Sequence, residues 1–279
     1  MGNLDGKVAV VTGGARGQGR AHAVELARRG CDVAVWDVAA PAAAPTVPYE
    51  LASTGDLAET VRLVETTGRR CEPVVADVRR TSDVMAALDA TTTALGRIDI
   101  LVANAGICSF AAVTEITDAM WDEMLATDLT GVFKPVRAVL PLMVRQGWGR
   151  VIATSSMAGR MGMPNLAHYV AAKWGVIGFI KSVALEVAAS GVTANVVCPA
   201  TVDTAMVHNR PMYSLFCPDL PDPSRADVEP VYRRMNPMRV PWLDTSDVAG
   251  AVAYLASDEA RYVSGTTLEV SMGGSAHLH

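Results

Sequence analysis

Residues Lys7–Gly19 read KVAVVTGGARGQG, and they set the architecture of the chain. The first half of this stretch is a run of mostly β-branched residues, as in a parallel strand that is buried on both faces. Glycines follow at once, and an amphipathic helix then runs through Ala23, Leu26 and Ala27 to Gly30. A strand, a glycine turn and a helix in this order predict a site where the backbone closely approaches a phosphate group.

The glycine turn supplies the residues that we expect to hold a pyrophosphate. Glycine lacks a Cβ, so the backbone can approach the ligand, and the helix N-terminus offers unpaired N–H groups and positive potential. The residues predicted to bind here are Gly13, Arg16, Gly17, Gln18 and Gly19. An ordinary tight turn between a strand and a helix is the alternative interpretation.

The second predicted strand, residues 32–36, is followed by Asp37. A carboxylate about 20 residues beyond the glycines is typical of an acceptor for the ribose hydroxyls of a bound dinucleotide. It would repel a 2′-phosphate, so Asp37 favours NAD over NADP. Arg16 supports the opposite preference, because a cation in the glycine loop could bind that phosphate, unless Arg16 is simply a solvated loop residue.

A long connection follows Asp37 and covers residues 38–55. Connections of this type usually contain about 2–6 residues, whereas this one is several times longer and rich in alanine and proline. Thr54 is the expected N-cap of the next helix. Because loops at the carboxyl ends of parallel strands border the ligand crevice, we expect this loop to fold over the adenosine half of the cofactor and slow its release. A loose surface insertion is the alternative.

Strands and helices alternate along most of the remaining chain. Apolar runs predict further strands at residues 73–78, 98–103, 149–156, 193–199 and 266–270. The segment of residues 125–133 resembles the middle of a long helix. The alternation predicts an α/β protein with one Rossmann-like domain over residues 1–279. Its doubly wound sheet should have about seven parallel strands, with helices on both faces.

The carboxyl ends of these strands carry polar and small residues that would meet at one edge of the sheet. They are Asp77, Val78, Asn104, Ala105, Gly106 and Ser156. A glycine-containing turn at residues 104–106 lets a ribose or nicotinamide ring pass close to the backbone. Asp77 could accept a hydrogen bond from an adenine amino group, or it could cap the helix of residues 82–95.

Tyr169 and Lys173 lie four residues apart, on one face of a predicted helix. The free side chains titrate at about pH 10, but the ammonium group favours the phenolate and so lowers the pKa of Tyr169. The pair is suited to proton transfer near neutral pH, and the Ser156 hydroxyl could hold a carbonyl or alcohol oxygen beside it. The alternative is an aromatic residue packed beside a solvated lysine.

Residues 5–274 resemble the classical short-chain dehydrogenases/reductases. The motifs that carry the resemblance follow the family's order and spacing: Thr12-Gly13-x-x-x-Gly17-x-Gly19, Asp77-Val78, Asn104-Ala105-Gly106, Ser156 and Tyr169-x-x-x-Lys173. The resemblance implies NAD(P)-dependent interconversion of an alcohol and a ketone. Tyr169 would be the acid/base, Lys173 would hold the nicotinamide ribose, and Ser156 would polarise the substrate oxygen. The residues implied to lie against the nicotinamide are Pro199, Val202 and Thr204.

A closer resemblance is to the carveol dehydrogenases of actinobacteria. It rests on residues 17–23, the long loop and residues 56–65. That group is associated with mycofactocin, a redox partner that would recycle NAD held in the enzyme. The family resemblance further implies a homotetramer with residues 174–187 in one interface.

Asp128 departs from the family pattern. The family usually has asparagine at this position, where it holds a helix kink and a water that leads to the lysine. An ionised aspartate accepts hydrogen bonds but cannot donate them. Asp128 is therefore a candidate catalytic residue that would relay protons or pair with Lys173.

Residues 205–243 contain seven prolines, and we expect an irregular lid over the nicotinamide. The methionine and aromatic side chains of this segment include Met206, Met212, Tyr213, Phe216, Met235, Met238 and Trp242. Methionine adapts to irregular apolar surfaces. The composition therefore suits a hydrophobic substrate, and we expect a terpenoid-like secondary alcohol.

Composition and charge argue against several other functions. The net charge of −5 disfavours non-specific nucleic-acid binding, and no apolar run approaches the roughly 20 residues that span a bilayer. The five cysteines are far apart and form no metal-binding pattern, so we expect reduced thiols, a cytoplasmic protein and no metal. Two alternatives to an NAD-dependent alcohol dehydrogenase are an NADP-dependent ketone reductase and a non-catalytic, cofactor-sensing protein of the same fold.

Overall fold

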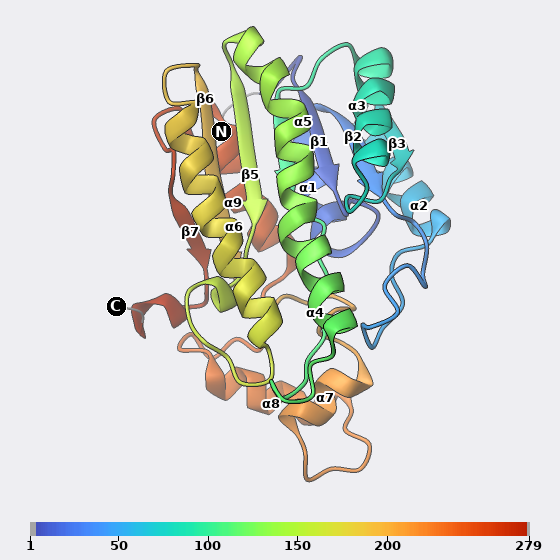
Figure 1. Cartoon of the computed structure of the whole chain (residues 1–279), viewed down its shortest axis with the longest axis vertical. Coiled ribbons are helices and arrows are strands. Elements are labelled where there is room, and N and C mark those ends of the chain that lie inside the picture. The colour runs from blue at the N-terminus through green and yellow to red at the C-terminus, as the bar shows by residue number, and fades with distance from the viewer. Residues whose placement is uncertain (1–3, 278–279) are drawn as a thin grey trace.

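The computed structural model describes residues 4–277. At its centre is a sheet of seven parallel strands in the order β3-β2-β1-β4-β5-β6-β7 (Figure 1). The strands are β1 Val8–Thr12, β2 Asp32–Asp37, β3 Cys71–Val75, β4 Ile100–Ala103, β5 Gly149–Thr154, β6 Val192–Pro199 and β7 Thr267–Val270. The chain order reverses between β1 and β4, which is where a doubly wound sheet opens a crevice for a ligand. The predicted sheet is confirmed.

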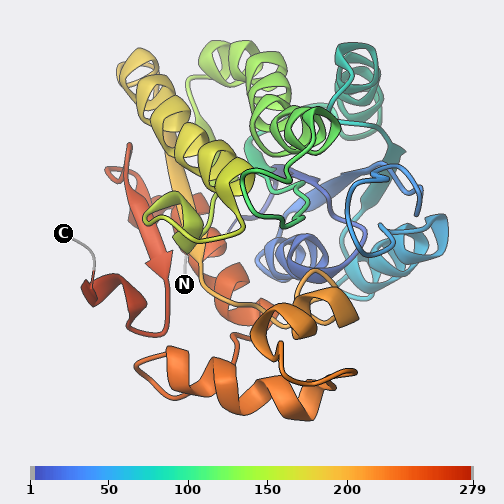
Figure 2. The same ribbon diagram turned by 60° about the horizontal axis from the view of Figure 1, so that its bottom comes forward.

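Helices cover both faces of this sheet, which Figure 2 shows from the side of the strands' carboxyl ends. One face packs against α3, α5 and α6, and the other packs against α1, α2 and α9. The helices are α1 Gly17–Arg28, α2 Thr54–Glu65, α3 Thr81–Leu95, α4 Asp118–Leu125, α5 Gly131–Gln146, α6 Ala167–Glu186, α7 Arg210–Phe216, α8 Arg225–Met235 and α9 Thr245–Ala256. Within residues 4–277, no helix is both long and apolar enough to cross a membrane.

The central strand β1 explains why both faces are covered. All of its residues are buried, and successive side chains of a strand point to opposite faces. Val8 and Val10 pack into the core beneath α3, α5 and α6, whereas Ala9 and Val11 pack into the core beneath α1, α2 and α9. A continuous apolar run is therefore required here.

The predicted helix over residues 125–133 is interrupted in the structure. α4 ends at Leu125, a π-helical turn covers Ala126–Thr130, and α5 begins at Gly131. A π-helical turn contains one residue more than an α-helical turn and is frequent at functional sites. A Cβ on Gly131 would come within 2.7 Å of the Val78 side chain, so α5 approaches the end of β3 closely.

Two predicted helix caps are corrected. Ser53, not Thr54, caps α2, and it forms a capping box with Asp56. Asp77 does not cap α3, whose N-cap position is Arg80. The side chain of Asp77 is occupied elsewhere, as described below.

The segment of residues 205–243 is more ordered than expected, because it contains the helices α7 and α8. Asn209 caps α7, and Ser224 forms a capping box with Asp227 at the start of α8. Pro211 lies in the first turn of α7, where a helix tolerates proline. In Figures 1 and 2 both helices lie beyond the carboxyl ends of the strands.

Candidate active site

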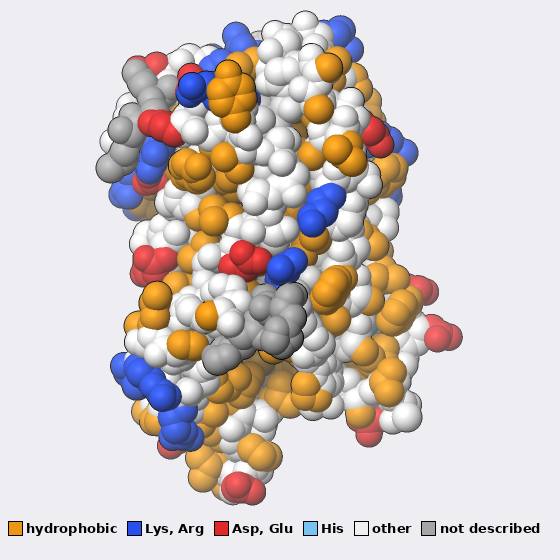
Figure 3. Space-filling model, turned by 90° about the vertical axis from the view of Figure 1, so that its left-hand side faces the viewer, with side chains coloured by type: hydrophobic (Ala, Val, Ile, Leu, Met, Phe, Trp, Pro, Cys, Tyr) orange, Lys and Arg blue, Asp and Glu red, His pale blue; other side chains and the backbone are white. Residues whose placement is uncertain are grey.

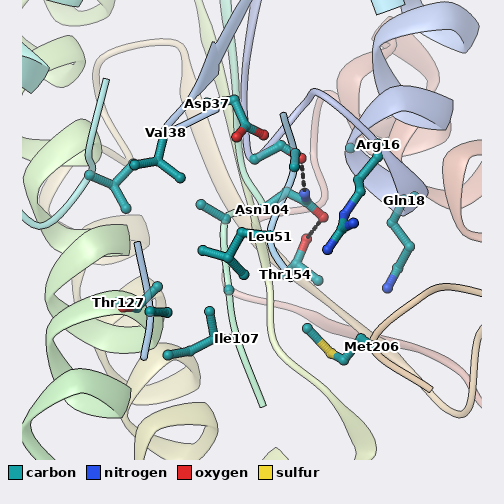
Figure 4. Close-up of a pocket in the computed structure, with 18 of the residues that line it drawn as sticks. Arg16, Gln18, Asp37, Val38, Leu51, Asn104, Ile107, Thr127, Thr154 and Met206 are labelled. Atoms are coloured by element: carbon teal, nitrogen blue, oxygen red, sulfur yellow. Dashed lines mark hydrogen bonds between the residues drawn. The ribbon is translucent and has the colours of Figure 1, made fainter. Parts of the chain in front are cut away.

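A cavity of about 200 Å³ opens at the carboxyl ends of the central strands. Three parts of the chain line it together: the glycine turn after β1, the inserted loop of residues 38–55, and the side chains of Tyr169 and Lys173 on α6. Figure 4 shows the portion of its wall formed by Arg16, Gln18, Asp37 and Asn104, with Leu51 of the inserted loop beside them. Residues distant in sequence thus share one site.

The glycine turn has the shape that a pyrophosphate cradle requires. Gly13 has a φ of +65°, and a Cβ there would lie 2.7 Å from Ala105 Cα. A Cβ on Gly19 would lie 2.0 Å from the carbonyl oxygen of Gly13. Gln18 Oε1 is buried and has no hydrogen-bond partner among the described residues. The turn and this unsatisfied atom fit a bound ligand with hydrogen-bond donors and phosphates.

Asp37 lies at the end of β2 with both carboxylate oxygens engaged by backbone. The N–H groups of Ala15 and Ala39 donate to it at 3.0 and 2.9 Å. Burial raises the pKa of Asp37, and these two hydrogen bonds oppose the rise. Each oxygen keeps a further lone pair, so the carboxylate can still accept from ribose hydroxyls in the cavity.

Arg16 lines the cavity and is not a simply solvated loop residue. It stands at the N-cap position of α1, and its guanidinium donates a hydrogen bond to the carbonyl oxygen of Glu50 in the inserted loop. Arg16 therefore connects the glycine turn to that loop.

Asp77 and Val78 lie in the cavity wall as predicted, but the Asp77 carboxylate is held by Arg79. The guanidinium donates to both carboxylate oxygens at 2.7–3.0 Å. Burial alone would raise the pKa of Asp77, yet the hydrogen bonds from Arg79 hold it below its usual range. The sequence analysis missed Arg79.

Arg79 also joins the adenine end of the cavity to the inserted loop. Its guanidinium donates to the carbonyl oxygen of Ala43 at 2.9 Å and lies 3.3 Å from Glu123 on α4. Glu123 in turn accepts from the N–H of Thr46 at 3.0 Å. Nothing in the sequence pattern indicated these contacts, because the loop has no periodicity that would fix its path.

The turn of residues 104–106 joins three strands. The Asn104 side chain donates to the Thr12 carbonyl at 3.1 Å and accepts from the Thr154 hydroxyl at 3.3 Å, a contact drawn in Figure 4. The N–H of Ala105 donates to the Thr12 hydroxyl at 3.1 Å. Gly106 lines the cavity beside them.

The inserted loop folds over the cavity. Its base is closed by a hydrogen bond of 2.9 Å from the N–H of Leu51 to the carbonyl oxygen of Pro41. Ala44 and Leu51 belong to an apolar cluster that includes Ile107 and Tyr169. The Tyr49 hydroxyl accepts from the N–H of Cys108. The loop therefore packs along the cavity wall from Arg79 to Tyr169, and it is not a loose surface insertion.

Tyr169 lines the cavity, and Lys173 lies one turn further along α6. Lys173 Nζ is 5.4 Å from the centre of the Tyr169 ring and donates to the carbonyl oxygen of Thr154 at 3.2 Å. Ser156 caps a short 3₁₀ turn, where its hydroxyl accepts from the N–H of Ala158, and the Ser156 side chain acts on Tyr169 to lower its pKa. The three predicted groups are therefore brought together, and Lys173 is buried rather than solvated.

The pKa of Tyr169 differs from the expectation. Burial raises the pKa of Tyr169 well above its usual value, and Cys108 and Asp128 raise it further. Ser156 acts in the opposite direction and lowers it. Lys173 is not among the main effects on this pKa, and the lysine ammonium is held by another group.

That group is Asp128, at the middle of the π-helical turn. Its Oδ2 lies 3.0 Å from Lys173 Nζ, and its Oδ1 accepts from the N–H of Ile107 at 2.8 Å. Burial raises the pKa of Asp128, opposed by the charge of Lys173. Of the two roles considered, the structure contains the pairing with Lys173.

The residues expected beside the nicotinamide differ in exposure to the cavity. Thr204 lines it together with Met206. Pro199 ends β6, opposite Val270 of β7, and Val202 is buried in a bridge to Leu243. Thr127 and Thr154 also line the cavity and were not predicted.

The lid is held by an aromatic and polar cluster. The His208 ring lies 2.9 Å from the Tyr213 hydroxyl and 3.0 Å from Asp203, and it contacts the ring of Trp242 edge-on. Met235 and Met238 are 59% and 68% exposed, so these two predicted lid residues face solvent.

Across residues 4–277, no three His, Cys, Asp or Glu side chains are grouped to hold a metal.

Comparison with known proteins identifies the family. Residues 7–212 match the model of the short chain dehydrogenase family. The chain belongs to this family.

Individual short-chain dehydrogenases resemble the chain over nearly its whole length. A (−)-trans-carveol dehydrogenase from Rhodococcus erythropolis is 38% identical over 275 residues, which cover 98% of this chain and 99% of the relative. The crystal structure of carveol dehydrogenase from Mycobacterium avium in complex with NAD has a TM-score of 0.95 and 41% identity, covering 99% of this chain and 100% of that one. Levodione reductase has a TM-score of 0.86 and 32% identity, covering 98% and 99%. The resemblance that the motifs predicted is confirmed.

Proposed function

We propose that this short-chain dehydrogenase uses NAD to interconvert a hydrophobic secondary alcohol and its ketone, with Tyr169 as the acid/base. One observation carries the proposal: the glycine turn, Asp37 and the pair Tyr169 and Lys173 line the same cavity. A dinucleotide and a proton-transfer group would therefore meet there.

NAD fits the residues present. A Cβ on Gly13 would collide with Ala105, and one on Gly19 would collide with the backbone of Gly13, so this tight turn requires glycine. Buried Gln18 Oε1 lacks a partner among residues 4–277. Asp37 favours a ribose diol over a 2′-phosphate, because its carboxylate would repel the phosphate. Arg16, the cation that would favour NADP, lines the same cavity and donates one hydrogen bond to the Glu50 carbonyl oxygen. The carveol dehydrogenase from M. avium carries NAD, which supports the same choice.

The chain's own residues would move the proton. When bound, NAD accepts a hydride during alcohol oxidation, and NADH donates one during ketone reduction. In oxidation, the Tyr169 phenolate takes the hydroxyl proton as the carbonyl forms, and the proton is later lost to solvent. In reduction, the Tyr169 phenol gives its proton to the carbonyl oxygen. Ser156 holds that oxygen through a hydrogen bond, while Lys173 holds the nicotinamide ribose.

The substrate that we propose is a terpenoid-like alcohol. Met206 enters the cavity (Figure 4), and the lid helices α7 and α8 carry Phe216 and Tyr232 with ring centres 4.6 Å apart. Carveol dehydrogenase and levodione reductase are among the relatives. The methionine and aromatic side chains of the lid segment suit an apolar ligand.

We also propose that the inserted loop retains NAD and that mycofactocin recycles it. The loop is joined to the adenine end through Arg79 and to the catalytic end through Tyr49. Opening it would break both sets of contacts. A cofactor that does not leave needs a redox partner that reoxidises it in place.

The assembly that we propose is a cytoplasmic homotetramer. Large apolar side chains remain exposed on the outer sides of α5 and α6: Val144 is 41%, Trp174 49% and Leu185 82% exposed. Figure 3 views the molecule from the side of α6 and β7 and shows hydrophobic side chains spread over this face among scattered charged ones. All five cysteines lie in the described part of the chain and are free thiols, as in a reducing compartment.

The experiment is to identify the nucleotide that purified protein releases on denaturation. The native protein is then assayed with carveol, first with added NAD and then with an artificial electron acceptor. We expect released NAD, and oxidation that depends on the artificial acceptor if the cofactor does not exchange. Released NADP would contradict the cofactor assignment. Bound nucleotide without turnover by either route would favour the cofactor-sensing alternative.

A further inference from the structure

The ion pair between Asp128 and Lys173 is buried at the catalytic end of the cavity. The two side chains are 0% and 4% exposed. The π-helical turn presents the carboxylate to Lys173, and the N–H of Ile107 fixes its other oxygen. A Cβ on Gly106 would lie 3.0 Å from Asp128 Oδ2 and 3.3 Å from Lys173 Nζ. The pair therefore depends on glycine at that position.

The groups that act on Tyr169 come from several elements. Lys173 lies on its own helix, Asp128 on the π-helical turn, Cys108 on the segment after β4, and Tyr49 on the inserted loop. The neighbouring His168 turns its ring to the Ser109 hydroxyl at 2.9 Å, and burial lowers its pKa, so it adds no charge at neutral pH. Cys108 is also neutral there, because burial raises its pKa to about 12.

Lys173 is thus the cation that would stabilise a Tyr169 phenolate, and Asp128 balances its charge. An asparagine could still accept the hydrogen bond from Ile107 through its amide oxygen, but it would leave the lysine charge unbalanced. With aspartate present, the phenol of Tyr169 is favoured over the phenolate. The phenol is the form that protonates a ketone, whereas the phenolate is the form that deprotonates an alcohol.

We propose that Asp128 is a positioning residue that pairs with Lys173 and thereby favours ketone reduction at neutral pH, with alcohol oxidation requiring a more alkaline solution. This inference rests on the proposed function. It assigns a kinetic direction to the site through the carboxylate that Asp128 places beside Lys173.

The first test is the pH profile of the Asp128→Asn variant, assayed with carveol and with the corresponding ketone. Removing one charge should lower, by about one unit, the pH at which kcat/KM for carveol oxidation rises. On the acidic side of the profile, kcat/KM would therefore be about tenfold higher than in the parent. The decline of ketone reduction should move the same way. The matched control is Asp122→Asn, which removes an exposed charge from α4 and should leave both profiles in place.

A second test needs no turnover. The ultraviolet absorbance of tyrosinate is titrated in parent and Asp128→Asn proteins, each compared with its own Tyr169→Phe counterpart. The difference signal should appear at lower pH in the Asp128→Asn pair. An unchanged titration, a shift to higher pH, or an equal loss of activity at every pH would overturn the proposal. If the parent oxidises no carveol, the proposed substrate fails while this titration still decides the role of Asp128.

Discussion

The Tyr49 hydroxyl accepts a hydrogen bond of 2.9 Å from the backbone N–H of Cys108. This contact joins the inserted loop to the segment that follows β4, across the cavity that contains Tyr169. The two residues are far apart in the sequence. Burial of the Tyr49 side chain raises its pKa above the usual value. The loop is therefore part of the active-site wall.

Tyr49→Phe should release the cofactor faster. The substitution keeps the ring but leaves the Cys108 N–H without its acceptor, and an unsatisfied buried group costs about 1–3 kcal/mol, equivalent to roughly a tenfold or larger increase in off-rate. Stopped-flow displacement of bound NADH, followed by fluorescence, measures it. Tyr262→Phe changes a ring that is 89% exposed and serves as the control. Equal off-rates in Tyr49→Phe and the parent would show that the loop does not retain the cofactor through this contact.

Asp37→Asn should weaken NAD binding and reduce discrimination against NADP. The amide loses the negative charge that repels a 2′-phosphate, and its nitrogen cannot accept from either Ala15 or Ala39. We expect NAD affinity to fall by about tenfold or more, because hydrogen bonds to charged groups are worth about 1.5–3 kcal/mol. Calorimetric titration with both nucleotides measures the ratio, with Asp89→Asn on α3 as an exposed control. An unaltered preference would remove Asp37 from the ribose site.

His22 should make the protein less stable in acid. Burial lowers the pKa of His22 from 6.5 to about 4, so the unfolded state binds a proton between these values that the folded state does not. The free energy of unfolding therefore falls as the pH decreases from 6.5 to 4, by about 3 kcal/mol from this group. Denaturant unfolding across this range should show a shallower pH dependence in His22→Leu than in the parent. Parallel curves would mean that His22 is protonated equally in both states.

The elements with strong periodicity could be predicted from the sequence. The strand, glycine turn and helix around Gly13 identified the fold, and Asp37 lies at the end of β2 beside the glycine turn, where the sequence placed it. The lid helices were missed, because seven prolines suggested irregular structure, although Pro211 lies where a helix begins.

Contacts between aperiodic segments could not be predicted in the same way. Pairing with Lys173 was one of the two roles expected for Asp128, but the sequence did not show the π-helical turn that presents the carboxylate to the lysine. The link from Arg79 to Ala43 depends on the path of the inserted loop. The path of this loop leaves no pattern in the sequence. The lowered pKa expected for Tyr169 was wrong because burial, which only the folded structure shows, raises it.

The most direct test of the central proposal is single-turnover hydride transfer from carveol in Tyr169→Phe, with bound NAD matched to that of the parent. The substitution removes the proton-transfer group and keeps the ring that packs against the inserted loop. We predict a rate lower by about 10²–10⁴ with unchanged NAD content. Hydride transfer as fast as in the parent would contradict the assignment of Tyr169 as the acid/base.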